Sequence, residues 1–146
     1  MRTLAFCFVL LCGQVHADTM NHYMNIVNSI PKMEMKADPQ AQAWARSARN
    51  VLTITAESIA ETLLEANASA STQGKPFFCL PVNQQLSAAT LNSLIQQTYR
   101  ANDSQLTDKD NMTVSQMAWT AVKKTYPCSS KTTHPDNQMQ HMSAAQ

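Results

Sequence analysis

Two cysteines have the clearest chemistry in this sequence. Cys79 precedes Leu80 and Pro81, and Cys128 directly follows Pro127. They are the only cysteines that remain once the N-terminal leader described below is removed. In an exported protein, two such thiols are expected to oxidise to a structural disulfide. A bridge that closes a loop of about fifty residues contributes about 4 kcal/mol in the chain-entropy model. We therefore predict one Cys79–Cys128 disulfide.

The other reactive side chains do not form a catalytic pattern. Catalysis by a nucleophile needs that group beside an oriented base, and the histidines after the leader are scattered: His22 lies on a predicted helix, whereas His134 and His141 lie in a polar tail. Zinc-binding spacings such as Cys-x-x-Cys or His-Glu-x-x-His are absent. We predict no enzyme activity, no catalytic residue, no cofactor and no metal site.

An acidic row keeps one alternative open. Glu57, Glu61 and Glu65 recur every four residues on a predicted helix whose N-terminal half carries Arg46 and Arg49. This arrangement opposes the helix dipole and places like charges beside one another, so it costs a few tenths of a kcal/mol per contact. No opposing acid that would complete a glycosidase pair is identified. The row is either a solvated face or an acidic strip for a basic partner.

Residues 1–17 have the features of a secretory signal peptide. Arg2 supplies the positive charge, an apolar run extends from Leu4 to Leu11, and Val15-His16-Ala17 is a small-residue cleavage site. We predict cleavage after Ala17 and a secreted or periplasmic protein. The apolar run is short of the roughly 20 residues that a membrane span needs, and no later segment comes closer. No membrane span is expected.

Composition indicates an all-α domain. Removing Arg2 leaves ten basic and ten acidic residues, so the mature chain has no net charge with neutral histidines and offers nucleic acid no electrostatic footprint. Only two glycines occur, which argues against tight hairpins and phosphate-binding loops. About 110 residues, 18–128, suffice for one core. We predict a single all-α domain of four helices, with room for short additional ones, clasped by one disulfide.

The first two helices are placed by capping residues and prolines. The first is capped by Thr19 or the residue before it and ends before Pro31, because proline disfavours the α region for its predecessor. The second begins with Asp38 as its cap and Pro39 as its first residue, and runs to about Ala66. The predicted inner faces hold Met20, Tyr23, Met24, Val27 and Ile30 in the first helix, and Trp44, Ala48, Val51, Leu52, Thr55, Ile59 and Leu63 in the second.

Two further helices are expected inside the cysteine pair. Ser87 caps one, with Leu86 and Leu91 as a hydrophobic staple, and Thr113 caps the other, which Pro127 stops. The expected buried positions are Leu91, Leu94, Ile95, Thr98 and Tyr99 in the former, and Val114, Met117, Ala118, Ala121, Val122 and Tyr126 in the latter. Trp119, like Trp44, sits at helical spacing and is expected in the core.

Three segments are expected to lie outside the helices. Residues 67–75, rich in Ala, Ser and Thr, form a predicted flexible loop. Residues 101–112 are acidic and have no core-forming run, so they should project. Residues 129–146 are polar and are predicted to be a disordered tail. The tail holds two histidines and two methionines that could bind a transition metal, but nothing fixes their geometry, and an uncommitted tail is favoured.

The combination of an exported leader, a long helix and two cysteines with neighbouring prolines resembles a known family. The sharpest motifs are the Cys79-Leu80-Pro81 opening and the Tyr126-Pro127-Cys128 ending, and the matching part spans roughly Ala41 to Cys128. This layout is similar to the Tai and Rap immunity proteins of type VI secretion systems, which are small periplasmic helical proteins. They protect a bacterium from peptidoglycan-cleaving amidase effectors. The acidic loop is longer than in that family, and the tail is additional.

The resemblance implies a function and a set of contact residues. A protein of this kind is a non-enzymatic inhibitor that binds its cognate amidase and occludes the active-site cleft, often as a homodimer that inserts a loop. Only Cys79 and Cys128 carry over residue by residue, as the structural bridge. For the inserting segment, the acidic and hydrogen-bonding side chains that could engage the Cys–His pair of such an amidase are Asp103, Ser104, Gln105, Asp108 and Asp110. An ordinary exposed loop is the alternative.

Two other functions fit the same features. Small periplasmic acid-stress chaperones are also exported, helical and closed by one disulfide, and they act by exposing apolar surface at low pH. An accessory subunit of a surface apparatus is the third hypothesis, supported only by the leader and the tail. Co-purification with a cell-wall amidase would separate the first hypothesis from the other two.

Overall fold

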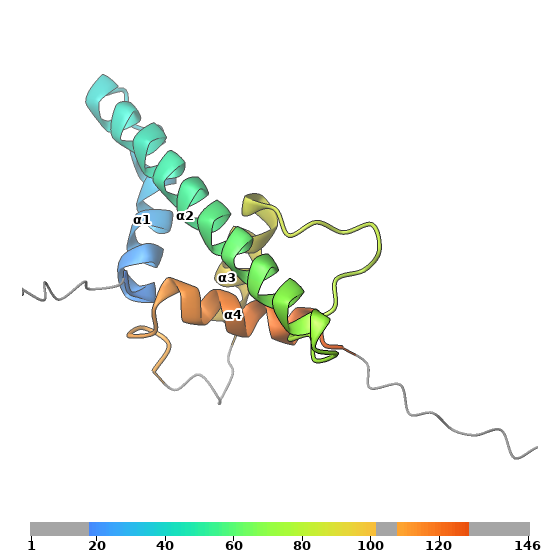
Figure 1. The fold of residues 1–146 in the computed structure, drawn as a ribbon. Coiled ribbons are helices and arrows are strands. Elements are labelled where there is room, and N and C mark those ends of the chain that lie inside the picture. Colours follow the sequence, from blue (N-terminus) through green and yellow to red (C-terminus); the bar gives the residue numbers. More distant parts are fainter. Residues whose placement is uncertain (1–17, 102–107, 129–146) are drawn as a thin grey trace, which may run out of the picture.

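The computed structural model describes residues 18–101 and 108–128. They form a single domain of four helices, α1 (Met20–Glu34), α2 (Pro39–Thr72), α3 (Ala88–Arg100) and α4 (Val114–Thr125), and these two ranges contain no strand. Figure 1 shows the arrangement. The predicted four-helix, all-α fold is confirmed. The predicted signal peptide, residues 1–17, and the predicted tail, residues 129–146, lie outside the described residues.

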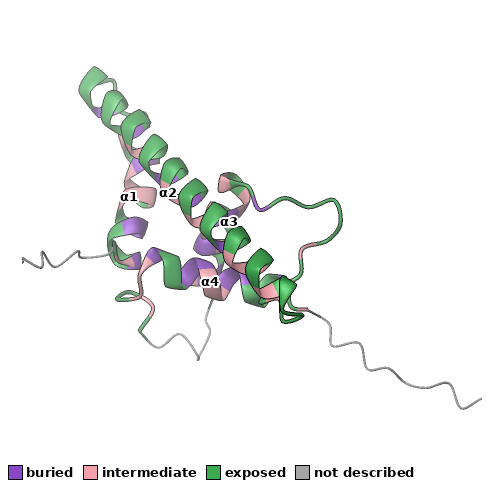
Figure 2. Ribbon diagram, viewed as in Figure 1, coloured by how far each residue is buried: buried purple, intermediate pink, exposed green. Residues whose placement is uncertain are grey.

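Helix α2 is the axis of the fold. Its 34 residues span about 51 Å at 1.5 Å per residue. A short turn connects it to α1, which lies along its N-terminal half, whereas α3 and α4 lie against its C-terminal half (Figure 1). All three pack on one side of α2, so its opposite side is exposed along the whole helix (Figure 2).

Local capping starts each helix where the sequence predicts. The side-chain oxygen of the cap residue accepts a hydrogen bond from a backbone N–H of the first turn in all four helices, which satisfies a donor that the helix itself cannot. The cap of α4 is a complete capping box, in which the Gln116 side chain also accepts from the N–H of Thr113 at 2.9 Å. The caps are Thr19, Asp38, Ser87 and Thr113.

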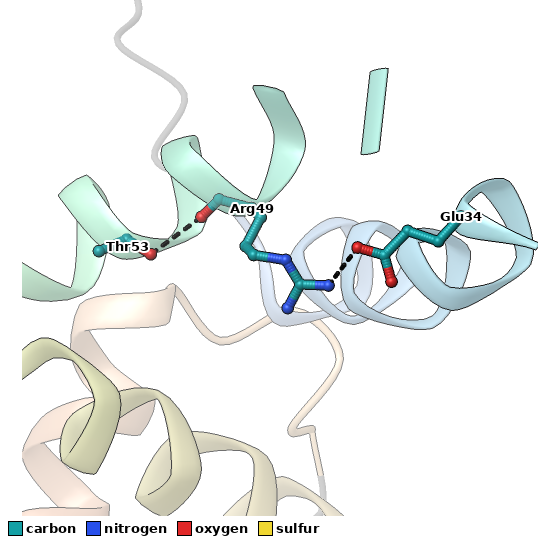
Figure 3. Close-up of polar contacts among 3 residues, drawn as sticks. All are labelled: Glu34, Arg49 and Thr53. Carbon is teal, nitrogen blue, oxygen red and sulfur yellow. Dashed lines mark hydrogen bonds and ion pairs between the residues drawn. The ribbon is translucent and has the colours of Figure 1, made fainter. Parts of the chain in front are cut away.

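Two predicted helix ends are wrong. Helix α1 passes through Pro31 to Glu34, because the buried Ile30 and the half-buried Met33 pack against the core on both sides of the proline. Glu34 then forms an ion pair with Arg49 of α2 (Figure 3). This packing offsets the penalty of proline inside a helix.

Helix α2 also continues beyond the predicted end at Ala66, to Thr72. The hydroxyls of Ser71 and Thr72 donate to the carbonyls of Asn67 and Ser69, both at 2.7 Å, within the last turns. Gly74 follows with a φ of 72°, a left-handed conformation that glycine adopts without strain and that ends helices. The predicted flexible loop therefore begins only after residue 72.

The core lies between α2 and the other three helices. The predicted faces of α1, α3 and α4 are buried or half-buried, and Phe78 and Leu86 of the connecting segment join them. On α2 the prediction is partly wrong, because Trp44 and Val51 are exposed and alanines take their place. Small side chains let the neighbouring helices approach α2 closely. The buried residues of α2 are Ala41, Ala45, Leu52, Ala56, Ala60 and Leu63.

The predicted disulfide is formed. Cys79 and Cys128 are bonded, their Cα atoms lie 4.9 Å apart, and the loop between them contains α3 and α4. Beside the bond, the N–H of Cys79 donates to the carbonyl of Tyr126 at 2.9 Å, and the Tyr126 hydroxyl accepts from Gln84 at 2.9 Å. The start and the end of this helical pair are therefore joined both covalently and by hydrogen bonds.

Candidate functional site

The chain around residue 18 is tied to the start of α4. The N–H groups of Met20 and Asn21 donate to the carbonyls of Met112 and Asp110, at 2.8 and 3.0 Å, and the N–H of Val114 donates to the carbonyl of Asp18 at 3.1 Å. These bonds satisfy donors at the N-termini of α1 and α4, which have no partner within their own helices. The end of the 101–112 loop is thereby fixed against α1.

The same loop is also fixed to the end of α3. The Tyr99 hydroxyl donates to Asp110 Oδ1 at 2.6 Å. Lys109 Nζ donates to the Tyr99 carbonyl at 2.9 Å and lies 4.9 Å from the centre of the Tyr99 ring. The Asp110 carboxylate, through this hydrogen bond, raises the pKa of Tyr99. We call these residues, Tyr99, Lys109 and Asp110, the loop base.

The structure therefore gives the predicted contact residues different surroundings. Asp103, Ser104 and Gln105 lie outside the described residues. Asp110 belongs to the loop base, where its carboxylate already accepts a hydrogen bond. Asp108 is exposed, and its carboxylate accepts from the Asn111 amide at 2.8 Å within its own turn. Both carboxylates are exposed and each accepts one hydrogen bond, but only that of Asp110 is bonded to a side chain of another element, Tyr99 of α3.

A groove that the sequence did not predict runs between α2 and α4. Its larger part has a volume of about 580 Å³ and is mostly apolar, with Leu63 and Ala66 on one wall and Trp119 on the other. A smaller hollow of about 350 Å³ continues it toward Asp18, past Ile59. The two helices diverge here, because α4 packs mainly on α3. We call both parts the α2–α4 groove.

Aromatic side chains form the rim of this groove. Trp119, expected in the core, is half-buried there, and the exposed Phe77 packs edge-on against it with ring centres 5.0 Å apart. Lys123 Nζ lies 5.7 Å from the Trp119 ring, within the range of a cation–π contact. An apolar hollow edged by aromatic rings is the usual form of a site that receives an apolar side chain.

The outward side of α2 is a second uncommitted surface. Val51 and Ile54 are 54% and 63% exposed, and the Glu57, Glu61 and Glu65 row is exposed beside them. None of these glutamates forms an ion pair with another described residue. We define the outer face of α2 by Arg46, Val51, Ile54, Glu57 and Glu61. Sequence reasoning assigned Val51 to the core, whereas alanines, at positions 41, 45, 56 and 60, take the buried positions of α2.

In the described part of the chain, no three histidine, cysteine, aspartate or glutamate side chains come together as a metal site would require. The two tail histidines and two tail methionines lie outside those residues. The same described helices include none that is long and apolar enough to cross a membrane.

Comparisons with protein-family models, with curated proteins and with solved structures gave no match. The features of the chain that bear on function are the loop base, the α2–α4 groove, the outer face of α2 and the sequence motifs.

Proposed function

We propose that the protein is a periplasmic immunity protein, exported by a signal peptide cleaved after Ala17, that binds a peptidoglycan-cleaving amidase effector of a type VI secretion system. It inhibits the amidase by occluding the active-site cleft, has no enzyme activity or cofactor of its own, and acts as a homodimer. The support from sequence is the similarity of the two cysteine–proline motifs to the Tai and Rap family.

The loop base is the structural observation that carries this proposal. An inhibitor that presents a loop has to fix both ends of it, since every degree of freedom lost on binding reduces the affinity. Here Lys109 and Asp110 are held by Tyr99 at the end of α3, and Asn21 and Met20 of α1 hold the segment that follows. The disulfide joins the far ends of the same helical pair. Such anchoring is typical of a pre-organised binding surface.

The direct test is inhibition of a cell-wall amidase from the same organism. The purified chain should form a complex with one such amidase and reduce its hydrolysis of peptidoglycan in proportion to occupancy. Co-expression should also rescue cells in which that amidase is exported. Failure to bind and to protect against every type VI amidase of the organism would contradict the proposal.

Substitutions test whether the predicted loop residues contact the amidase. Replacing Asp103, Ser104, Gln105 and Asp108 together by alanine should raise the dissociation constant of the complex at least about tenfold, as expected when contacts at the centre of an interface are lost. The matched control is Asn83→Ala with Gln85→Ala, which replaces two exposed polar residues in the segment between α2 and α3. Equal affinity of the loop variant and the control would place the contact elsewhere.

A chaperone function has one observation in its favour, which is the apolar surface that the fold leaves open. Val51, Ile54 and the walls of the α2–α4 groove are accessible. If this surface serves unfolded clients, acidification should increase the binding of a hydrophobic dye and suppress aggregation of a model client. An immunity protein of the kind proposed above should show neither effect.

A further inference from the structure

We propose that the outer face of α2 is a self-association surface, on which α2 of a second copy of this chain packs antiparallel about a twofold axis near residues 52 and 53. This inference deepens the homodimer within the proposed function and assigns its interface. It rests on the pattern of apolar and charged residues along one exposed side of a long helix.

The apolar centre of the face fits a twofold axis. In an antiparallel pair centred between residues 52 and 53, Val51 of one copy lies opposite Ile54 of the other, and each contact occurs twice. Both side chains are more than half exposed, so self-association would remove apolar surface from water. Toward the two ends of this centre, Ser47 lies opposite Ser58, and both are small, exposed residues that allow the helices to approach.

The charges select the antiparallel orientation. Arg46 precedes the centre and Glu57 and Glu61 follow it, and all three are exposed. In the antiparallel pair, Arg46 of one copy lies level with a point midway between Glu57 and Glu61 of the other, about 3 Å along the axis from each. A parallel pair would place arginine against arginine and glutamate against glutamate. The charge order that opposes the dipole of a single α2 is thus complementary between two copies.

Residues at one edge of the outer face of α2 support the same alignment of the two antiparallel helices. Trp44 and Thr62 are eighteen residues apart, which is five full turns, so they lie on one line of the helix. In an antiparallel pair this line faces its own counterpart, and Trp44 of one copy comes level with Thr62 of the other. Thr62 lines the α2–α4 groove, and Trp44 is 42% exposed. The indole of each copy thereby covers the apolar groove of the other.

The first experiment measures self-association of the exported chain with its disulfide intact, by sedimentation equilibrium and without an amidase. The wild-type chain should form a dimer, and Val51→Lys should raise its dissociation constant at least about tenfold. Val82→Lys is the matched control, because Val82 is fully exposed in the segment between α2 and α3, and it should dimerise like the wild type. A wild-type chain that stays monomeric, or equal effects of the two lysines, would overturn the proposal.

The second experiment tests the relative orientation of the two α2 helices. It uses two charge variants whose mixture should restore the dimer, so its outcome does not depend on whether a single variant folds. Arg46→Glu, and separately Glu57→Arg with Glu61→Arg, should each abolish the homodimer by placing like charges together. An equimolar mixture of the two should form a heterodimer, since every charge then meets its opposite. No heterodimer would exclude the antiparallel pairing. A monomeric chain that still inhibits the amidase would overturn this surface and the homodimer but leave the amidase inhibition standing. A dimer that inhibits no amidase would overturn the proposed inhibition but leave this surface standing.

Discussion

Asn67 shows how a single side chain directs the chain after α2. Its Oδ1 accepts from the N–H groups of Phe77 and Phe78, at 2.8 and 3.1 Å, and its Nδ2 donates to the Phe78 carbonyl at 3.0 Å. The Asn67 side chain thus pairs with backbone groups of Phe77 and Phe78 as a neighbouring β-strand would. It holds the backbone of Phe78, whose ring is buried in the core, directly before the first cysteine of the disulfide.

We expect Asn67→Ala to lower the free energy of unfolding by about 1–3 kcal/mol, because it leaves backbone groups near the core without a partner. Asn67→Asp should cost less, since the two accepted bonds remain possible. The measurement is chemical denaturation followed by circular dichroism. Asn83→Ala, at an exposed asparagine of the segment between α2 and α3, is the control and should have no effect; a similar loss there would contradict the assigned role.

Ionisation of Tyr23 should make the stability of the fold depend on pH in the alkaline range. Its hydroxyl donates to Asn92 of α3, and burial raises its pKa to about 12, although a side-chain hydrogen bond with Gln96 acts in the opposite direction. The folded state therefore keeps a proton that the unfolded chain loses near pH 10. The associated stability is fully present below about pH 10 and is lost as the pH rises toward 12.

Replacing Tyr23 by phenylalanine should flatten that part of the pH profile. Between about pH 10 and 12, the free energy of unfolding of the wild type should fall by roughly 2–3 kcal/mol more than that of Tyr23→Phe. Urea titrations at several pH values measure the difference. Parallel profiles for the two proteins would show that Tyr23 is not protected from ionisation by the fold.

At the scale of elements, the two sides of α2 have different tasks. Its inner side carries alanines that admit α1 and α3 at short range, and its outer face keeps Val51 and Ile54 in solvent. The Glu34–Arg49 ion pair joins α1 to α2 at the edge between the two sides (Figure 3). Both side chains of this pair are exposed to solvent, so we expect the pair to contribute less than about 1 kcal/mol.

Pro31 allows a test of whether core packing holds α1 together against the helix-breaking preference of proline. Pro31 lies inside the helix and is exposed, so it removes a backbone hydrogen bond without contributing a core contact. Pro31→Ala should raise the free energy of unfolding by about 1–2 kcal/mol, a part of the helix penalty of proline. The measurement is the denaturation midpoint. Pro81→Ala, outside any helix, should not stabilise the protein, and a gain at Pro81 equal to that at Pro31 would contradict this explanation.

At the scale of the whole molecule, the disulfide closes the half of the fold that contains α3 and α4. The bridge spans 49 residues of sequence separation, and the chain-entropy model gives about 4 kcal/mol for such a loop. The loop base and the bonds between residues 18–21 and 110–114 lie at the opposite end of α4. This helical pair is therefore held at both ends.

Reduction of the disulfide should lower the free energy of unfolding by about 4 kcal/mol. The double variant Cys79→Ser with Cys128→Ser should match the reduced wild type, since both remove the same constraint on the unfolded chain. Denaturation with and without a thiol reductant measures the change, and the double variant should not respond to reductant. Identical curves for oxidised and reduced wild type would exclude a stabilising bridge.

The sequence by itself determined the class of fold, the four helix starts and the cysteine pair. Capping is local, because Thr19, Asp38, Ser87 and Thr113 each bond a backbone group two or three residues away. The faces of α1, α3 and α4 were also predictable, since their large apolar residues recur at helical spacing. No long-range contact is needed for any of these predictions.

Only the tertiary structure decided where α1 and α2 end, which side of α2 is buried, and that a groove opens beside α4. These features depend on how closely two helices approach. Alanine permits a close approach that its own hydrophobicity does not reveal, so Trp44 and Val51 were assigned to a core that excludes them. The loop base likewise joins Tyr99 to Asp110 across a loop, and the spacing of the two residues in the sequence carries no sign of that contact.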